Sequence, residues 1–171
     1  EKFNEPKSPL QKIVYDSKNR ELLRELLYSA FNKYFVIDIT HAGQLEIKYS
    51  DKKPISDSQE LGLSTESFTY HKGNQSIDEF SDGVKAYTGI LLGLMTSESN
   101  IILLDEPEAF LHPSLVFSLG KQISSYIVDK TKNVFISTHN ANFIMGCLQT
   151  GIPITIIRLT SSDKLSIFVI K

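Results

Sequence analysis

Four consecutive apolar residues, Ile101 to Leu104, lead directly into the paired carboxylates of Asp105 and Glu106. A short apolar run of this kind is typical of a strand buried in a sheet, and the following Pro107 ends it. Open α/β sheets bind their ligands beside the carboxyl ends of their strands. We therefore expect a buried strand over residues 100–104 that presents two acids at the edge of a sheet.

Predicted helices and strands alternate along the chain from residue 77 onward. Helices are expected over residues 81–96, 113–129 and 141–149, and strands over residues 100–104, 133–137, 154–159 and 165–170. Strands separated by helices of about 10 to 15 residues indicate crossover units and a parallel sheet. The fold class predicted here is α/β, with a mainly parallel sheet flanked by helices.

The first part of the chain, residues 1–76, has a different pattern. Apolar residues recur with helical spacing over 17–34, and two short strands are expected over 35–39 and 44–49. The turn-like residues between these strands indicate an antiparallel hairpin. Residues 51–76 are polar and are interpreted as a loop, with one further strand near 67–70. We treat residues 1–76 and 77–171 as two parts of one domain.

Two further motifs flank the acids. Ser81 and Gly83 open a predicted helix 24 residues before Asp105, and His139 follows an apolar strand 34 residues after it. A helix start with a free hydroxyl and exposed N–H groups binds anions, although Ser81 also suits a plain N-cap. A histidine at a strand end contacts a phosphate in some proteins and is structural in others.

The chemistry of phosphoryl transfer connects these residues. Hydrolysis of a γ-phosphate needs a metal that neutralises charge, a group that deprotonates water, and donors around the phosphate oxygens. Asp105 is the candidate Mg²⁺ ligand and Glu106 the candidate general base. Their alternative interpretation is a strand that ends in solvated carboxylates. The combination with Ser81 and His139 favours a nucleoside triphosphatase.

The sequence resembles ABC-type ATPase heads of the SMC, RecF and OLD (overcoming lysogenization defect) group. The strings DEPEAFLHP and STHNANF look most like OLD-like bacterial AAA-type ATPases. The resemblance implies a P-loop NTPase-type domain in which Ser81 and Gly83 form the signature motif, and Asp105 and Glu106 form Walker B. It also implies a D-loop over residues 108–112 and a switch histidine at His139. ATP and Mg²⁺ would be bound between two copies, as a homodimer.

One motif of the family is missing. The sequence contains no G-x-x-x-x-G-K-[ST] loop, so Walker A is expected in an N-terminal lobe of a longer parent chain. The isolated fragment is expected to be inactive. The alternative function is a dimerisation or regulatory module without turnover. OLD-like relatives often carry a TOPRIM nuclease and act in DNA repair or phage defence, but these residues contain no D-x-D pair for such a nuclease.

Composition narrows the remaining possibilities. A net charge of −2 argues against a strongly basic nucleic-acid surface, although a local patch of Lys and Arg would suffice for DNA. No apolar run approaches the roughly 20 residues of a membrane span. The single cysteine, Cys147, fits a reducing compartment, and we expect a cytoplasmic protein. Cys147 is expected to be a small buried residue on a helix, and His112 to cap the helix that follows it.

Overall fold

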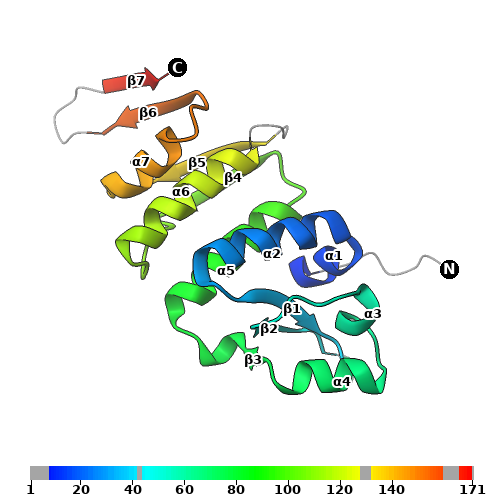
Figure 1. Ribbon diagram of the computed structural model, residues 1–171. Helices are drawn as coiled ribbons and strands as arrows, with labels where there is room; N and C mark the ends of the chain where they lie inside the picture. The colour runs from blue at the N-terminus through cyan, green and yellow to red at the C-terminus, as the bar shows by residue number, and fades with distance from the viewer. Residues whose placement is uncertain (1–7, 42–43, 128–131, 160–165, 171) are drawn as a thin grey trace. The chain divides into compact units, whose positions relative to one another are not determined.

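The computed structural model describes residues 8–41, 44–127, 132–159 and 166–170 (Figure 1). It divides the chain into two compact units, Glu1–Glu98 and Ser99–Lys171. The sequence predicted a different division, between residues 76 and 77, which separates two parts of one ATPase head. That division stays a prediction. Within the described ranges, no helix combines the length and the apolar character needed to cross a membrane.

The first unit packs helices around an antiparallel sheet. Its helices are α1 (Pro9–Tyr15), α2 (Ser17–Phe31), α3 (Asp57–Glu60), α4 (Thr65–Lys72), the 3₁₀ turn η1 (Ile77–Glu79) and α5 (Asp82–Thr96). Its strands are β1 (Tyr34–Asp38), β2 (Glu46–Ser50) and β3 (Gln75–Ser76), in the order β1-β2-β3. The predicted hairpin is confirmed, because β1 and β2 pair antiparallel with Val36 opposite Lys48.

Helix α2 shows how local signals set the limits of an element. The side chain of Asp16 accepts a hydrogen bond from the Asn19 N–H at the start of the helix. At the other end Asn32 adopts a left-handed conformation, with φ 54°, and its N–H bonds to Tyr28 O. The helix therefore ends before Tyr34, the limit predicted for it. Its buried Leu23 and Leu27 lie one turn apart and join the core.

The polar segment predicted as a loop is more ordered than expected. Helices α3 and α4 occupy it, and residues 67–70, interpreted above as a strand, lie inside α4. Ser56 and Ser64 cap these helices by accepting hydrogen bonds from Gln59 N–H and Ser67 N–H. Polar capping and buried polar contacts order this segment, so hydrophobic periodicity gave no signal for it.

The second unit contains the elements predicted to carry the site. They are β4 (Ile101–Asp105), α6 (Pro113–Ile127), β5 (Asn133–Ser137), α7 (Ala141–Leu148), β6 (Ile154–Arg158) and β7 (Ser166–Ile170). Within the described residues the only parallel pair is β4 with β5, whereas β6 and β7 pair antiparallel. The prediction of a mainly parallel sheet was thus wrong in one respect: parallel pairing is present, but among the described residues it is limited to two strands. Parts of two predicted elements, residues 128–129 and Leu165, lie outside the described residues.

The exposure of β4 and β5 alternates along each strand. Leu103 is 74% exposed and Phe135 is 60% exposed, although the register places them side by side. The strand predicted over residues 100–104 was expected to be buried, but in β4 one face is half-buried, at Ile102 and Leu104, and the other face is exposed. Ile101, Leu103 and Phe135 are the large apolar residues of the exposed face.

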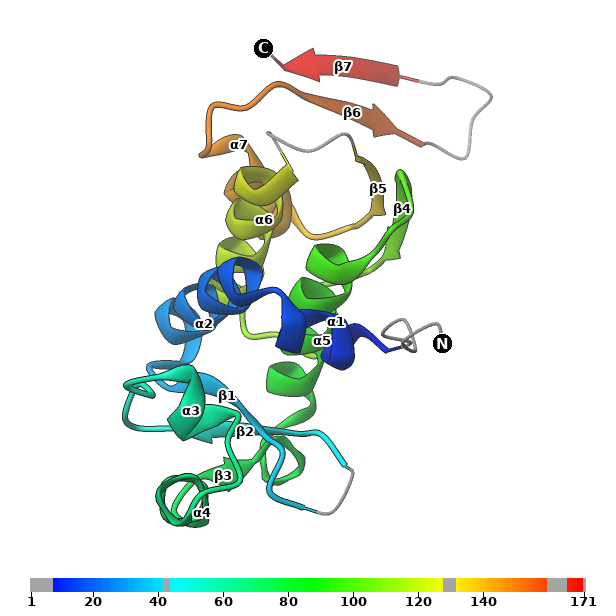
Figure 2. The same cartoon turned by 90° about the vertical axis from the view of Figure 1, so that its right-hand side faces the viewer.

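Helices α6 and α7 lie side by side (Figures 1 and 2). Two glycines, Gly120 and Gly146, lie in their contact. A Cβ atom on Gly146 would lie 2.1 Å from Phe117 O, and one on Gly120 would lie 2.4 Å from Phe143 O. These are backbone atoms, so no side chain can move aside. The absence of a Cβ at both positions therefore permits the close helix contact that buries Leu119 and Phe143.

The Gly146→Ala variant should destabilise the second unit by about 1–3 kcal/mol, because the added methyl group forces the two helices apart. The matched control is Gly89→Ala in α5, where a Cβ meets nothing within 4 Å. That change should stabilise by about 0.5–1 kcal/mol through helix propensity. Urea denaturation measures both effects. Equal stability of Gly146→Ala and wild type would show that the helices are farther apart than described.

Candidate functional site

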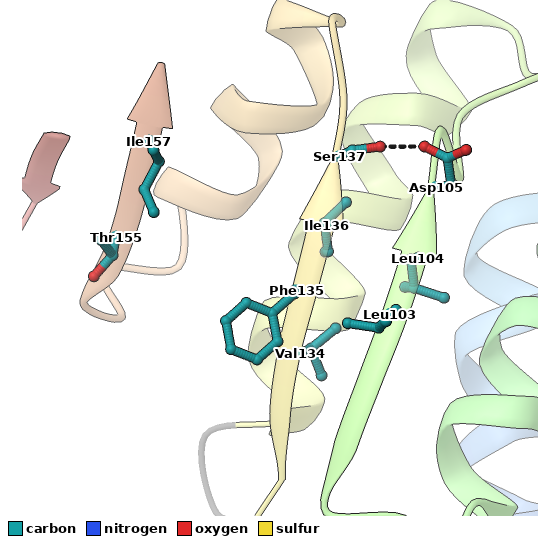
Figure 3. A pocket seen from close by; sticks show the side chains of 9 residues that line it. All are labelled: Leu103, Leu104, Asp105, Val134, Phe135, Ile136, Ser137, Thr155 and Ile157. Carbon is teal, nitrogen blue, oxygen red and sulfur yellow. Dashed lines mark hydrogen bonds between the residues drawn. The ribbon is translucent and has the colours of Figure 1, made fainter. Parts of the chain in front are cut away.

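The parallel pairing of β4 and β5 brings the predicted acid and histidine motifs to one edge. In the strand register Asp105 lies opposite Ser137, the last residue of β5. The Ser137 hydroxyl donates a hydrogen bond to Asp105 Oδ1 (Figure 3). The residues that follow each strand, Glu106 and His139, therefore start from neighbouring positions.

Glu106 and His139 contact each other directly. Glu106 Oε1 lies 3.0 Å from His139 Nδ1, and both side chains are exposed to solvent. The Glu106 N–H also donates to Ser137 O, at 3.0 Å. Glu106 has a left-handed backbone, with φ 42°, which is unusual for a residue with a Cβ and costs about 1–2 kcal/mol. Such strain is found where the surroundings fix a functional side chain.

The turn that follows the acids contains a buried carboxylate. Glu108 is only 6% exposed, and its Oε1 accepts a hydrogen bond from the Thr138 hydroxyl. Phe110, two residues further on, is 82% exposed and also has a left-handed backbone, with φ 67°. The predicted D-loop is therefore a strained turn with one buried acid and one exposed aromatic ring.

The predicted signature residues belong to the first unit. Ser81 occupies the N-cap position of α5, but its side chain makes no capping hydrogen bond. Its carbonyl accepts from the N–H groups of Val84 and Lys85. Ser81 is exposed and Gly83 is buried in the first turn. The expectation of a side-chain cap is thus not met, and the hydroxyl stands at the helix start.

An open hollow of about 470 Å³ lies between β4–β5 and β6 (Figure 3). Its walls are mostly apolar and come from all three strands, with Asp105 and Ser137 at one end. The residues that line it are Leu103, Leu104, Asp105, Val134, Phe135, Ile136, Ser137, Thr155 and Ile157. Strands β5 and β6 are not paired with each other. The hollow thus separates the free edges of two small sheets.

Two sequence-based expectations about single residues are confirmed. His112 caps α6: its Nδ1 lies 3.0 Å from the Ser114 hydroxyl and accepts from the Ser114 N–H. Cys147 is buried on α7, and its Sγ donates to Gly120 O. Burial raises the pKa of the Cys147 thiol, which favours the protonated, unreactive form.

A second cluster of charged groups lies on the β1–β2 hairpin and was not predicted. Potential metal-binding atoms of Asp38, His41 and Glu46 lie within 4.8 Å of one another. Lys48 Nζ is 2.7 Å from the buried Asp38 Oδ2, and Thr40 donates two hydrogen bonds to Oδ1. Burial by itself would raise the pKa of Asp38, but these bonds outweigh it and lower the pKa to about 2. The lysine already supplies the cation, so we interpret the cluster as a structural ion pair.

Sequence reasoning did not predict the contacts of three residues at the edge of the parallel strands. Ser137, Thr138 and Glu108 connect the loop after β4 with the loop after β5. These contacts follow from the register: because Asp105 lies opposite Ser137 in a parallel pair, the residues after each strand also lie near each other. The sequence alone did not give that register.

The chain has an α/β fold that places two acids and a histidine at the ends of two parallel strands. A solved structure described as "Structural biochemistry of ATP-driven dimerization and DNA stimulated activation of SMC ATPases" is similar to this chain, with a TM-score of 0.55 and 12% sequence identity. The match covers 96% of this chain and 90% of that one. At this identity the likeness shows the fold.

The family follows from a second comparison. The model of the family described as "AAA domain, putative AbiEii toxin, Type IV TA system" matches residues 11–145, and the chain belongs to this family. No curated protein matches the chain. The family match and the likeness of fold together support an ATPase-type domain.

Proposed function

We propose that this chain is the C-terminal part of an OLD-like, ABC-type ATPase that binds and hydrolyses ATP between two copies of its head. The observation that carries the proposal is the contact of Glu106 with His139, beside Asp105, at the end of the parallel strands. A general base, a group that can face a phosphate, and a carboxylate for a metal are the components that phosphoryl hydrolysis requires.

Each residue has a role in this proposal. Asp105 would hold Mg²⁺, because carboxylate oxygens suit this ion and Asp105 stands exposed at the strand end. When bound, Mg²⁺ neutralises charge on the phosphates. Glu106 would orient and deprotonate the attacking water. His139 would face the γ-phosphate through Nε2, since Nδ1 lies against Glu106.

Ser81 and Gly83 would serve the nucleotide of the opposite copy. The start of α5 has an exposed Ser81 whose hydroxyl makes no capping hydrogen bond. The N–H groups of Val84 and Lys85 donate to the Ser81 carbonyl, so in the described structure the Ser81 hydroxyl and the N–H groups of Asp82 and Gly83 remain available. A 15-residue helix directs a partial positive charge toward this end, which favours phosphate oxygens. ATP would thereby join two heads into a homodimer.

The hollow beside β5 is the place where we expect a strand of the N-terminal lobe to bind. The sequence holds no phosphate loop, so the lobe that carries it must come from elsewhere in the parent chain if ATP is bound. Leu103, Phe135 and Ile157 present apolar surface next to edges of β5 and β6 that pair with no strand among the described residues. An added strand would satisfy these edges and bury the surface. We assign that strand to the N-terminal lobe.

We extend the proposal to a role in DNA repair or phage defence. The family description names a toxin system, and the similar structure is described as DNA-stimulated. DNA is therefore the proposed macromolecular partner, and a TOPRIM nuclease the proposed appended domain. The single, unpaired Cys147 is consistent with a cytoplasmic protein.

The Ser81→Arg variant of the full-length protein tests the proposal. A bulky cation at the signature turn should weaken ATP-dependent dimerisation by about tenfold or more, as measured by analytical ultracentrifugation with and without ATP. Folding should be unaffected, because the Ser81 side chain is exposed and caps nothing. Ser17→Arg, an exposed position in α2, is the matched control. Dimerisation equal to wild type would contradict the proposal.

A further inference from the structure

The buried Glu108 is a feature that the proposed reaction does not use. Its side chain lies in the turn after β4 and is almost fully shielded from water. Oε1 accepts from Thr138 Oγ1, and Oε2 has no partner within the described part of the chain. A buried carboxylate with a single hydrogen bond is unfavourable for stability, because desolvation of the charge is only partly compensated. Stability alone therefore does not account for a glutamate at this position.

Thr138 links Glu108 to the loop that carries His139. Its hydroxyl donates to Glu108 and accepts the Asn140 N–H at 3.0 Å. Asn140 in turn is the N-cap of α7, where its side chain accepts the Asn142 N–H at 2.9 Å. The position of the Glu108 carboxylate is thus connected, through one hydroxyl, to the start of a helix.

Three consecutive residues that begin with the last residue of β5 contact three residues at the end of β4 or in the turn that follows it. Ser137 bonds to Asp105, Thr138 to Glu108, and His139 to Glu106. The first and third contacts are exposed, whereas the middle one is part-buried. A shielded hydrogen bond to a carboxylate is stronger than an exposed one, because water competes less for its atoms. The middle contact therefore holds the two loops together most firmly.

We propose that Glu108 is a positioning residue, which acts through the Thr138 hydroxyl to hold the His139 imidazole against Glu106. The inference rests on the proposed function, because the contact matters for catalysis only if Glu106 and His139 act on ATP. Loss of the Glu108–Thr138 bond would let the two loops separate while the strands stay paired. Glu106 and His139 would then be present but misaligned.

The kinetic test uses the full-length protein with isosteric variants. Thr138→Val removes the hydroxyl and should lower kcat for ATP hydrolysis about tenfold with an unchanged KM, whereas Thr138→Ser should restore wild-type kcat. Thr150→Val is the matched control: the Thr150 hydroxyl also donates one hydrogen bond, to Cys147 O, and accepts one, from Ile152 N–H, at the other end of α7. Glu108→Met should match Thr138→Val, and the double variant should lose no more than either.

A second measurement needs no ATP and separates failure of this inference from failure of the proposed function. In the nucleotide-free full-length protein, Thr138→Val should shift the His139 ring signals in NMR spectra and make the ring more mobile. Thr150→Val should leave them unchanged, and the signals of His41, His71 and His112 serve as internal references. Unchanged His139 signals in Thr138→Val, or an equal kcat loss in Thr150→Val, would overturn the inference. Altered signals in a protein that does not hydrolyse ATP would support the positioning contact and contradict the proposed function.

Discussion

The Glu106→Gln variant of the full-length protein should bind ATP as wild type does and hydrolyse it about 10²- to 10⁴-fold more slowly. Glutamine has the same shape as glutamate and can still contact His139, whose Nδ1 lies 3.0 Å from Glu106 Oε1. It cannot accept a proton from the attacking water. The variant therefore removes the base and leaves the surrounding geometry intact.

Initial rates of phosphate release and equilibrium binding of ATP measure the two halves of this prediction. Glu25→Gln, on the exposed side of α2, is the control for loss of a surface carboxylate and should leave both quantities unchanged. Unchanged turnover in Glu106→Gln would remove Glu106 from its proposed role. Turnover and ATP binding that are both absent in wild type would instead favour a module for dimerisation or regulation.

The Glu60→Ala variant should destabilise the first unit by about 3–5 kcal/mol, because it leaves two buried cations without their shared partner. Glu60 is 1% exposed, and its Oε2 lies 2.7 Å from Arg24 Nη2 and 3.5 Å from Arg20 Nε. Its Oε1 also accepts the Ile37 N–H of β1, at 3.0 Å. One side chain thus connects α3, α2 and the sheet.

Urea denaturation of Glu60→Ala and of a control variant measures this effect. Glu66→Ala in α4 removes an exposed carboxylate that contacts only Gln59 in the described structure, and it should change stability by less than about 0.5 kcal/mol. A loss below about 1 kcal/mol for Glu60→Ala would show that water or other groups compensate the two arginines.

The two strands that consist of a clear apolar run between polar residues were predicted closely from the sequence. Strand β5 has the predicted limits, and β4 differs by one residue at each end. The pattern succeeds there because an apolar run between polar residues has few alternatives. The apolar pattern failed over residues 51–76. Glu60 and His71 are buried there through polar contacts, and His71 Nε2 lies 2.7 Å from Glu60 O. Contacts between polar groups leave no apolar periodicity in the sequence, so this pattern cannot predict them.

The residues of the candidate site could be predicted from the sequence, but some of the hydrogen bonds between them could not. The acids and His139 were identified from spacing, and the structure brings Glu106 and His139 together. Their roles stay predictions, as do those of Ser81 and Gly83. The Thr138–Glu108 contact could not be predicted, because it depends on the register of two strands and on a turn with two left-handed residues, Glu106 and Phe110.

The central claim is that one active site combines Asp105, Glu106 and His139 of one copy with Ser81 of the other. Mixing full-length Ser81→Arg with full-length Glu106→Gln tests it most directly, because each variant alone should be inactive. Half of randomly formed dimers are mixed and each holds one intact site of two, so about a quarter of the wild-type ATPase rate should return. A mixture no more active than the separate variants would contradict a site shared between two copies.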